Sequence, residues 1–136
     1  MRSATLSFVR NRADNRCEYC RIHQDDEPLW TFHVEHIIAR QHGGLDHLDW
    51  LALACHECNF RKGPNLAGID PESGRRAWLF NPREQNWARH FRWQGPVLVG
   101  RTAIGRATIA VLGINISERV AFRKTLVEAQ VFPPES

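Results

Sequence analysis

All four cysteines of the chain lie within residues 17–63, which have the sequence CEYCRIHQDDEPLWTFHVEHIIARQHGGLDHLDWLALACHECNFRKG. They form two C-x-x-C pairs, and no cysteine is left over. Each C-x-x-C turn directs two thiolates at one point, so two such turns complete the tetrahedral four-sulfur shell that a structural zinc ion prefers. The spacing therefore predicts a structural Zn2+ site formed by Cys17, Cys20, Cys55 and Cys58.

Two other uses of these cysteines are weaker predictions. Two disulfides would suit an oxidising compartment, but the N-terminus has no apolar signal-peptide segment and a cytosol keeps thiols reduced. A thioredoxin-like redox site does not need two matched pairs. A closed four-cysteine site has no open coordination position, so we expect this zinc to stabilise the fold, by an amount on the order of 10 kcal/mol, and not to catalyse.

The segment between the two pairs has the composition of a strand. Residues 29–38 are rich in aromatic and β-branched residues, which favours extended structure. Period-2 alternation places His33 and Glu35 on a polar face, and Trp30 and Phe32 on the opposite, packing face. We therefore expect one strand of a small sheet here, with its polar face available for chemistry.

Short helical segments are predicted on either side of this strand. Ser3 can cap a helix that runs to about Ala13 and leads into the first cysteine pair. After the second pair, residues 59–64 indicate a helical turn that ends at Gly63 and Pro64.

Together these residues resemble the HNH endonuclease motif in its zinc-ribbon-bearing form. The resemblance covers about residues 14–66 and rests on four strings in order, which are HVEHII at 33–38, Gly43-Gly44, CHECN at 55–59 and Lys62-Gly63. It implies an α+β fold with a ββα-metal nuclease core over residues 1–66. In that core a hairpin and a helix surround one catalytic divalent cation, with the structural four-cysteine zinc site behind it.

The resemblance also implies roles for individual residues. His36 takes the place of the first histidine, the general base that activates water. Glu35 stands where the family usually has an aspartate ligand of the catalytic cation, and Asn59 matches the second expected ligand. The middle asparagine is replaced by Trp50, with Asp49 beside it. In the family that asparagine holds the loop between the strands by hydrogen bonds, and an indole cannot accept one in the same way.

The chemistry of phosphodiester hydrolysis agrees with these roles. A base must take a proton from the attacking water, and a cation must neutralise charge on the phosphoryl oxygens and the departing 3′ oxygen. A histidine titrates near neutrality, while Mg2+ or another hard divalent cation prefers carboxylate and amide oxygens. We expect Glu35 and Asn59 to hold that cation. His33 shares the face of Glu35 and is a further candidate ligand, the alternative being a half-buried strand histidine.

Basic residues indicate a polyanionic partner. Arg40, Arg61 and Lys62 flank the expected site and are candidates for contacts to DNA phosphates, although a solvated surface charge is the alternative for each. The net charge of the chain is +3, and the positive excess lies after Gly63. A normally solvated surface is the alternative explanation of this mild charge, and the resemblance to HNH endonucleases is what implies DNA as the partner.

Residues 67–136 predict a mixed, mainly helical C-terminal extension that packs on the core. Residues 65–74 indicate a linker or a pair of turns. The elements expected after it are a strand around 76–80, a helix over 81–89, a hairpin over 91–99 and helices over 102–112 and 117–130. Parts of this region loosely resemble the extension of small stand-alone bacterial HNH proteins. Its interleaved arginines and aromatic residues suit phosphate contacts with base stacking, and packing of the aromatic residues is the alternative.

Composition limits the function classes that remain. With 43% hydrophobic and 24% charged residues, the chain is neither disordered nor fibrous, and no apolar run is long enough to span a membrane. We therefore expect a cytoplasmic protein with no membrane partner. The prediction is a metal-dependent HNH endonuclease that cuts DNA, with no prediction of oligomeric state. The alternatives are a non-catalytic zinc-ribbon nucleic-acid-binding protein and a zinc-stapled protein-interaction module.

Overall fold

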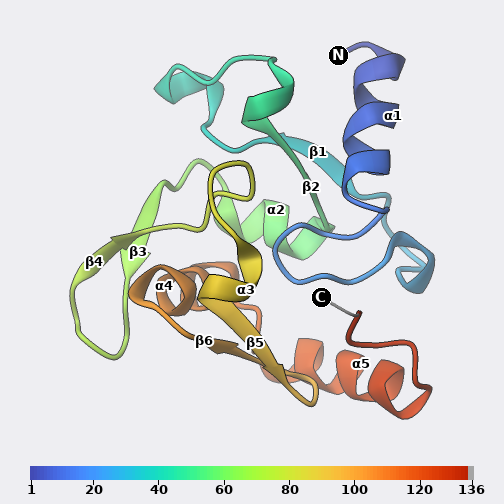
Figure 1. Ribbon diagram of the computed structural model, residues 1–136, viewed down its shortest axis with the longest axis vertical. Helices are drawn as coiled ribbons and strands as arrows, with labels where there is room; N and C mark the ends of the chain where they lie inside the picture. The colour runs from blue at the N-terminus through green and yellow to red at the C-terminus, as the bar shows by residue number, and fades with distance from the viewer. Residues whose placement is uncertain (135–136) are drawn as a thin grey trace. The chain divides into compact units, whose positions relative to one another are not determined.

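The computed structural model describes residues 1–134, which form two compact units (Figure 1). Unit 1 comprises Met1–Asn65 and Asn81–Glu84, and unit 2 comprises Leu66–Phe80 and the described residues from Gln85 onward. The short segment Asn81–Glu84 thus belongs with residues that precede it by many positions in the chain. Every candidate site residue lies in unit 1, while the packing of an extension on a core stays a prediction.

The centre of unit 1 is a hairpin followed by a helix. Strand β1 (His33–His36) pairs antiparallel with β2 (Leu51–Ala54), in a register that places His36 opposite Leu51. Helix α2 (His56–Lys62) begins one residue after β2 ends. All four residues of β2 are buried, so this strand lies in the core of the unit. The arrangement confirms the predicted α+β fold.

Helix α1 (Ser3–Arg12) lies beside the hairpin (Figure 1) and buries Val9. The guanidinium of Arg12 donates to the carbonyls of Leu48 and Leu51, both at 2.9 Å, and so ties the helix to the start of β2. The predicted cap is wrong, because the helix is capped by Arg2, which makes no side-chain cap hydrogen bond. Three short 3-10 helices complete the unit, at Gln24–Asp26, Arg40–His42 and Leu48–Trp50.

Strand β1 is shorter than the strand predicted over residues 29–38. The side chain of Gln24 explains the difference, because its Nε2 donates to the Trp30 carbonyl at 3.0 Å and its Oε1 accepts from the Phe32 amide at 2.7 Å. A side chain therefore satisfies backbone groups that a neighbouring strand would otherwise pair. Trp30, predicted on the packing face, is exposed.

Unit 2 consists of two hairpins and three helices. The first hairpin pairs β3 (Ala67–Ile69) with β4 (Arg76–Trp78), and the second pairs β5 (Phe91–Gln94) with β6 (Val97–Gly100). The helices are α3 (Trp87–His90), α4 (Ala103–Leu112) and α5 (Ser117–Glu128). The predicted second hairpin and closing helices are confirmed. No helix within residues 1–134 is long and apolar enough to cross a membrane.

Two predictions in this region are wrong. Residues 65–74 contain strand β3 and are not only turns. The helix predicted over 81–89 is reduced to the single turn of α3, because Asn81 does not cap a helix. Its Oδ1 accepts from the amides of Arg83 at 2.9 Å and Glu84 at 3.3 Å in a local turn, and Asn86 caps α3 instead.

Candidate functional site

The four cysteines converge inside unit 1. They are buried, and their sulfur atoms all lie within 4.8 Å of one another. The Sγ atoms of Cys20 and Cys55 are 3.7 Å apart, about the separation of two sulfurs in a tetrahedral shell whose Zn–S bonds are about 2.3 Å. The amides of Cys20 and Cys58 donate to the first sulfur of their own pair, at 3.5 and 3.4 Å. The geometry fits the predicted structural zinc site.

Burial favours the neutral thiol form of these cysteines as long as no cation is bound. Shielding from water raises the pKa of the Cys17 thiol, and the neighbouring sulfurs raise the pKa of Cys55. Metal ligation needs the thiolate forms, whose charge a Zn2+ ion offsets. A bound zinc ion would therefore link the two chain segments through thiolates that the metal-free cluster does not favour.

Glu18 connects the first cysteine pair to the hairpin. Its amide donates to the Leu53 carbonyl at 2.8 Å, and its Oε2 accepts from the Leu53 amide at 2.8 Å. Arg83, from the segment that returns to unit 1, forms an ion pair with the other carboxylate oxygen. The first cysteine pair thus positions β2, which in turn pairs with β1.

Glu35 lies in the core of unit 1 and exposes only 7% of its surface. The Tyr19 hydroxyl donates to its Oε1 at 2.5 Å, and the Lys62 ammonium lies 3.6 Å from its Oε2. Lys62 is 2% exposed and also donates to the Ile37 carbonyl at 2.9 Å. Burial raises the pKa of Glu35, while Lys62 opposes that shift. This buried pair joins the first cysteine pair, β1 and α2.

His36 lies on the opposite face of β1, because strand side chains alternate. Its Nε2 is 2.5 Å from Oδ1 of Asp46, and Nη2 of Arg40 donates to both oxygens of the same carboxylate, at 2.9 and 3.1 Å. These hydrogen bonds, with that of His36 the largest, hold the pKa of Asp46 below its ordinary value. The three side chains form a polar cluster at the surface.

The short contact decides which nitrogen of His36 carries the proton. A carboxylate only accepts hydrogen bonds, so at 2.5 Å Nε2 carries a proton, and the neutral form of this imidazole has its lone pair on Nδ1. The Nε of Arg40 lies 3.4 Å from the same Nε2, which is the longer of the two contacts at this nitrogen. His36 therefore presents Nδ1 as a proton acceptor.

A group of four rings lies where β1 begins and α2 begins. Nε2 of His33 is 3.4 Å from Nδ1 of His56, and the His56 ring stacks on Trp30 with centroids 4.3 Å apart. On the same helix, Phe60 lies 6.3 Å from the His56 ring. Burial lowers the pKa of His33, and His56 and Arg10 lower it further, so His33 is neutral at neutral pH.

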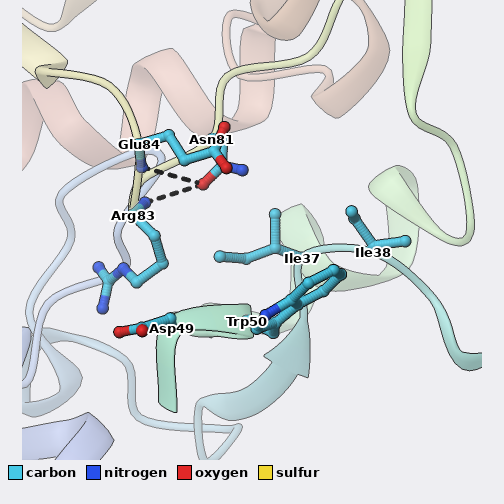
Figure 2. A pocket seen from close by; sticks show the side chains of 7 residues that line it. All are labelled: Ile37, Ile38, Asp49, Trp50, Asn81, Arg83 and Glu84. Atoms are coloured by element: carbon cyan, nitrogen blue, oxygen red, sulfur yellow. Dashed lines mark hydrogen bonds between the residues drawn. The ribbon is translucent and has the colours of Figure 1, made fainter. Parts of the chain in front are cut away.

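Trp50 occupies the place of the middle asparagine and lines a cavity of about 340 Å³ together with Ile37 and Ile38 (Figure 2). The loop ahead of β2 is held by His47 instead. Its Nδ1 accepts from the Asp49 amide at 3.2 Å, and its carbonyl accepts from the Trp50 amide at 2.8 Å. His47 thus supplies loop hydrogen bonds of the kind that the resemblance assigns to an asparagine.

The residues that form this site also match a known protein family. The model of the HNH endonuclease family matches residues 17–65, the segment that holds the four cysteines, the hairpin and α2. Residues 17–65 form an HNH domain. The predicted HNH domain is therefore confirmed over these residues, and it supports a nuclease-type function at the level of the family.

One curated relative extends the match beyond the HNH domain. Over 117 residues the chain is 25% identical to the Septu protein PtuB of Bacillus thuringiensis. The match covers 85% of this chain and 42% of that protein, so the chain spans less than half the length of the relative. No solved structure matches the chain significantly.

The predicted site residues differ from one another in their exposure to solvent. His36, Arg40 and Arg61 reach the surface, although Arg61 is paired with Glu57 at 3.0 Å. Asn59 is half-buried in α2, and its side chain makes no hydrogen bond to a residue in 1–134. Lys62, predicted to contact phosphates, is buried instead, so the structure gives it a role in holding Glu35.

A second, catalytic cation does not fit the predicted oxygen ligands as they are arranged. Both oxygens of Glu35 already face Tyr19 and Lys62, and the ammonium group supplies the positive charge that a cation would bring. Within residues 1–134, the four cysteines are the one group of at least three His, Cys, Asp or Glu side chains close enough to share an ion. Ligation of a divalent cation by Glu35, Asn59 and His33 stays a prediction.

Three residues of the site were outside the sequence-based predictions. Tyr19 lies between the first two cysteines, so a zinc site fixes its position and its closeness to β1 could have been suspected. His47 precedes a Trp where the family has an asparagine, which indicates that another group must hold the loop. Asp46 follows His36 by ten residues in an irregular loop, and no periodic or motif signal marks it.

Proposed function

We propose that the HNH domain is an endonuclease that hydrolyses phosphodiester bonds of DNA, with His36 as the general base. The observation that carries the proposal is the 2.5 Å contact between His36 Nε2 and Asp46 Oδ1. It orients the imidazole and leaves Nδ1 without a hydrogen-bond partner among residues 1–134. A base held in this way by a carboxylate is the arrangement that proton abstraction from water requires.

In the proposed reaction, Nδ1 of His36 takes a proton from water as the water oxygen attacks phosphorus. The bond from phosphorus to the 3′ oxygen breaks, and the departing oxygen takes a proton from solvent, which gives 3′-hydroxyl and 5′-phosphate ends. Asp46 stabilises the imidazolium that forms. Arg40 is 65% exposed, and its Nη1 group is available for a phosphate oxygen of the bound strand.

A requirement for a divalent cation such as Mg2+ is proposed from the HNH family alone. When bound, such an ion would neutralise charge on the phosphoryl group. Because the Glu35 carboxylate is occupied, no step above depends on that ion.

The test is nicking of supercoiled plasmid by the full zinc-loaded chain, with Mg2+ or Mn2+ added. Wild type is expected to produce nicked circles, whose ends a ligase reseals because they carry 3′-hydroxyl and 5′-phosphate groups. His36→Ala should abolish nicking, while Arg92→Ala, at an exposed position of β5, should retain it. Binding of DNA without nicking in every divalent metal would instead support the non-catalytic nucleic-acid-binding alternative.

A further inference from the structure

The side chains of Trp30, His33, His56 and Phe60 form a compact group on unit 1, here called the ring cluster. The rings of Trp30 and His56 are nearly parallel, at 10°, and those of His56 and Phe60 are inclined by 15°. His33 joins from β1 at a centroid distance of 5.6 Å from His56. Three rings of the ring cluster are therefore nearly parallel to one another.

The ends of this stack face solvent. Trp30 is 52% exposed and Phe60 is 76% exposed, and Leu29 beside Trp30 is exposed as well. Exposed aromatic surface gathered in one place marks a binding surface more often than a single exposed residue does. The exposed ring surface of Trp30 and Phe60 is therefore the feature that a partner must match.

The ring cluster shares its elements with the proposed catalytic residues. His33 begins β1, and His36 ends the same four-residue strand. His56 and Phe60 belong to α2, where Phe60 directly follows Asn59. The ring cluster and His36 are therefore carried by the same small hairpin, with His33 and His36 on opposite faces of β1.

The charge beside the ring cluster favours a polyanion that carries flat groups. Nη2 of Arg10 donates to the carbonyl of Phe32 at 3.0 Å, and Phe32 directly precedes His33, so a cation lies beside the ring cluster. A nucleotide offers both a flat base for the exposed rings and a phosphate for the arginine.

Base pairing determines which nucleic acid can use this surface. In a duplex each base is covered on both faces by its neighbours, whereas an unpaired base can leave the stack and lie on an aromatic side chain. We propose that the ring cluster binds unpaired nucleobases, so that the HNH site takes single-stranded or locally unpaired nucleic acid in preference to intact duplex. This inference rests on the proposed function, because it names the substrate class of the same site.

The test measures binding separately from cleavage. Full-length zinc-loaded His36→Ala protein, without added divalent metal, is titrated into a fluorescent oligothymidylate, an abasic strand of equal length and charge, and a duplex. The single strand should bind at least about tenfold more tightly than the abasic strand, since each stacked base contributes appreciable affinity. Adding Trp30→Ala and Phe60→Ala should remove that preference, while Trp78→Ala, at an exposed tryptophan of β4, should keep it.

Each outcome has a distinct meaning. Equal affinity for normal and abasic strands, or an unchanged preference in the folded Trp30→Ala/Phe60→Ala variant, overturns the inference even if wild type nicks plasmid. Zinc content and circular dichroism establish that the variant is folded. A change of sedimentation in that variant without a change of DNA affinity also overturns it, because the ring cluster is then a protein interface. A base-dependent preference in a chain that never nicks DNA supports the inference and rejects the proposed function.

Discussion

His36 and Asp46 meet at 2.5 Å, although one lies on β1 and the other in the loop before β2. The contact fixes the orientation of the imidazole and assigns its proton to Nε2. It therefore converts a surface histidine into a base that presents Nδ1. The relationship makes Asp46 a positioning residue, since it acts on water only through His36.

Replacing Asp46 by asparagine should lower the rate of DNA cleavage by about 10²-fold or more, because an amide allows the wrong tautomer of His36. DNA affinity should change little, and the pH profile of the rate should change shape. Asp49→Asn, in the same loop but at a carboxylate that lies 3.6 Å from His47 instead, provides the matched control. A cleavage rate and pH profile like those of wild type would show that the Asp46 contact does not position the base.

Breaking the buried pair of Glu35 and Lys62 should destabilise unit 1. Lys62→Met leaves an uncompensated carboxylate in the core, which should lower the free energy of unfolding by about 3–5 kcal/mol. Glu35→Gln/Lys62→Met should recover much of that loss, because neither charge then remains. Chemical denaturation of zinc-loaded protein measures the effect, with the exposed Lys124→Met as control. Unchanged stability combined with weaker DNA binding would restore the phosphate contact predicted for Lys62.

The burial of Glu35 could not be predicted from the sequence. The cysteine spacing and the motif strings could predict the zinc site, the hairpin and α2, because each depends on residues at fixed local spacing. Strand periodicity also placed Glu35 with His33 on a polar face. Its burial depends on Tyr19 and Lys62, which come from two other elements and converge on Glu35 only in the folded chain.

Removing zinc should unfold the HNH domain. Metal analysis is expected to find one zinc ion per chain, and a chelator should abolish the native circular dichroism of unit 1, since zinc contributes free energy on the order of 10 kcal/mol. Zn2+ should restore the signal, whereas Mg2+ should not. A chain that stays folded and zinc-free would contradict the assignment of Cys17, Cys20, Cys55 and Cys58.

Acidification should weaken the fold through histidines whose pKa is lower in the folded chain than in the unfolded one. Burial lowers the pKa of His33, with His56 and Arg10 adding to the shift, and burial likewise lowers that of His90. The unfolded chain then binds protons first, so stability should fall as the pH drops below about 6.5. His33→Gln should reduce the pH dependence of Tm, and the exposed His42→Gln should not. An identical dependence in both variants would contradict the shift at His33.

Local hydrogen bonding explains the other departures from the predicted structure. Asn81 followed by Pro82 has the sequence of a helix start, yet the Asn81 side chain closes a turn with the next amides. Gln24 similarly ends the extended run ahead of β1. In both cases one side chain satisfies backbone groups, and composition alone does not show which of its possible partners it takes.

The rate constant for nicking of supercoiled plasmid by zinc-loaded His36→Ala, relative to wild type at equal DNA occupancy, tests the central claim most directly. The proposed base predicts a loss of at least about 10²-fold with DNA affinity retained. A His36→Ala variant that nicks as fast as wild type would contradict it.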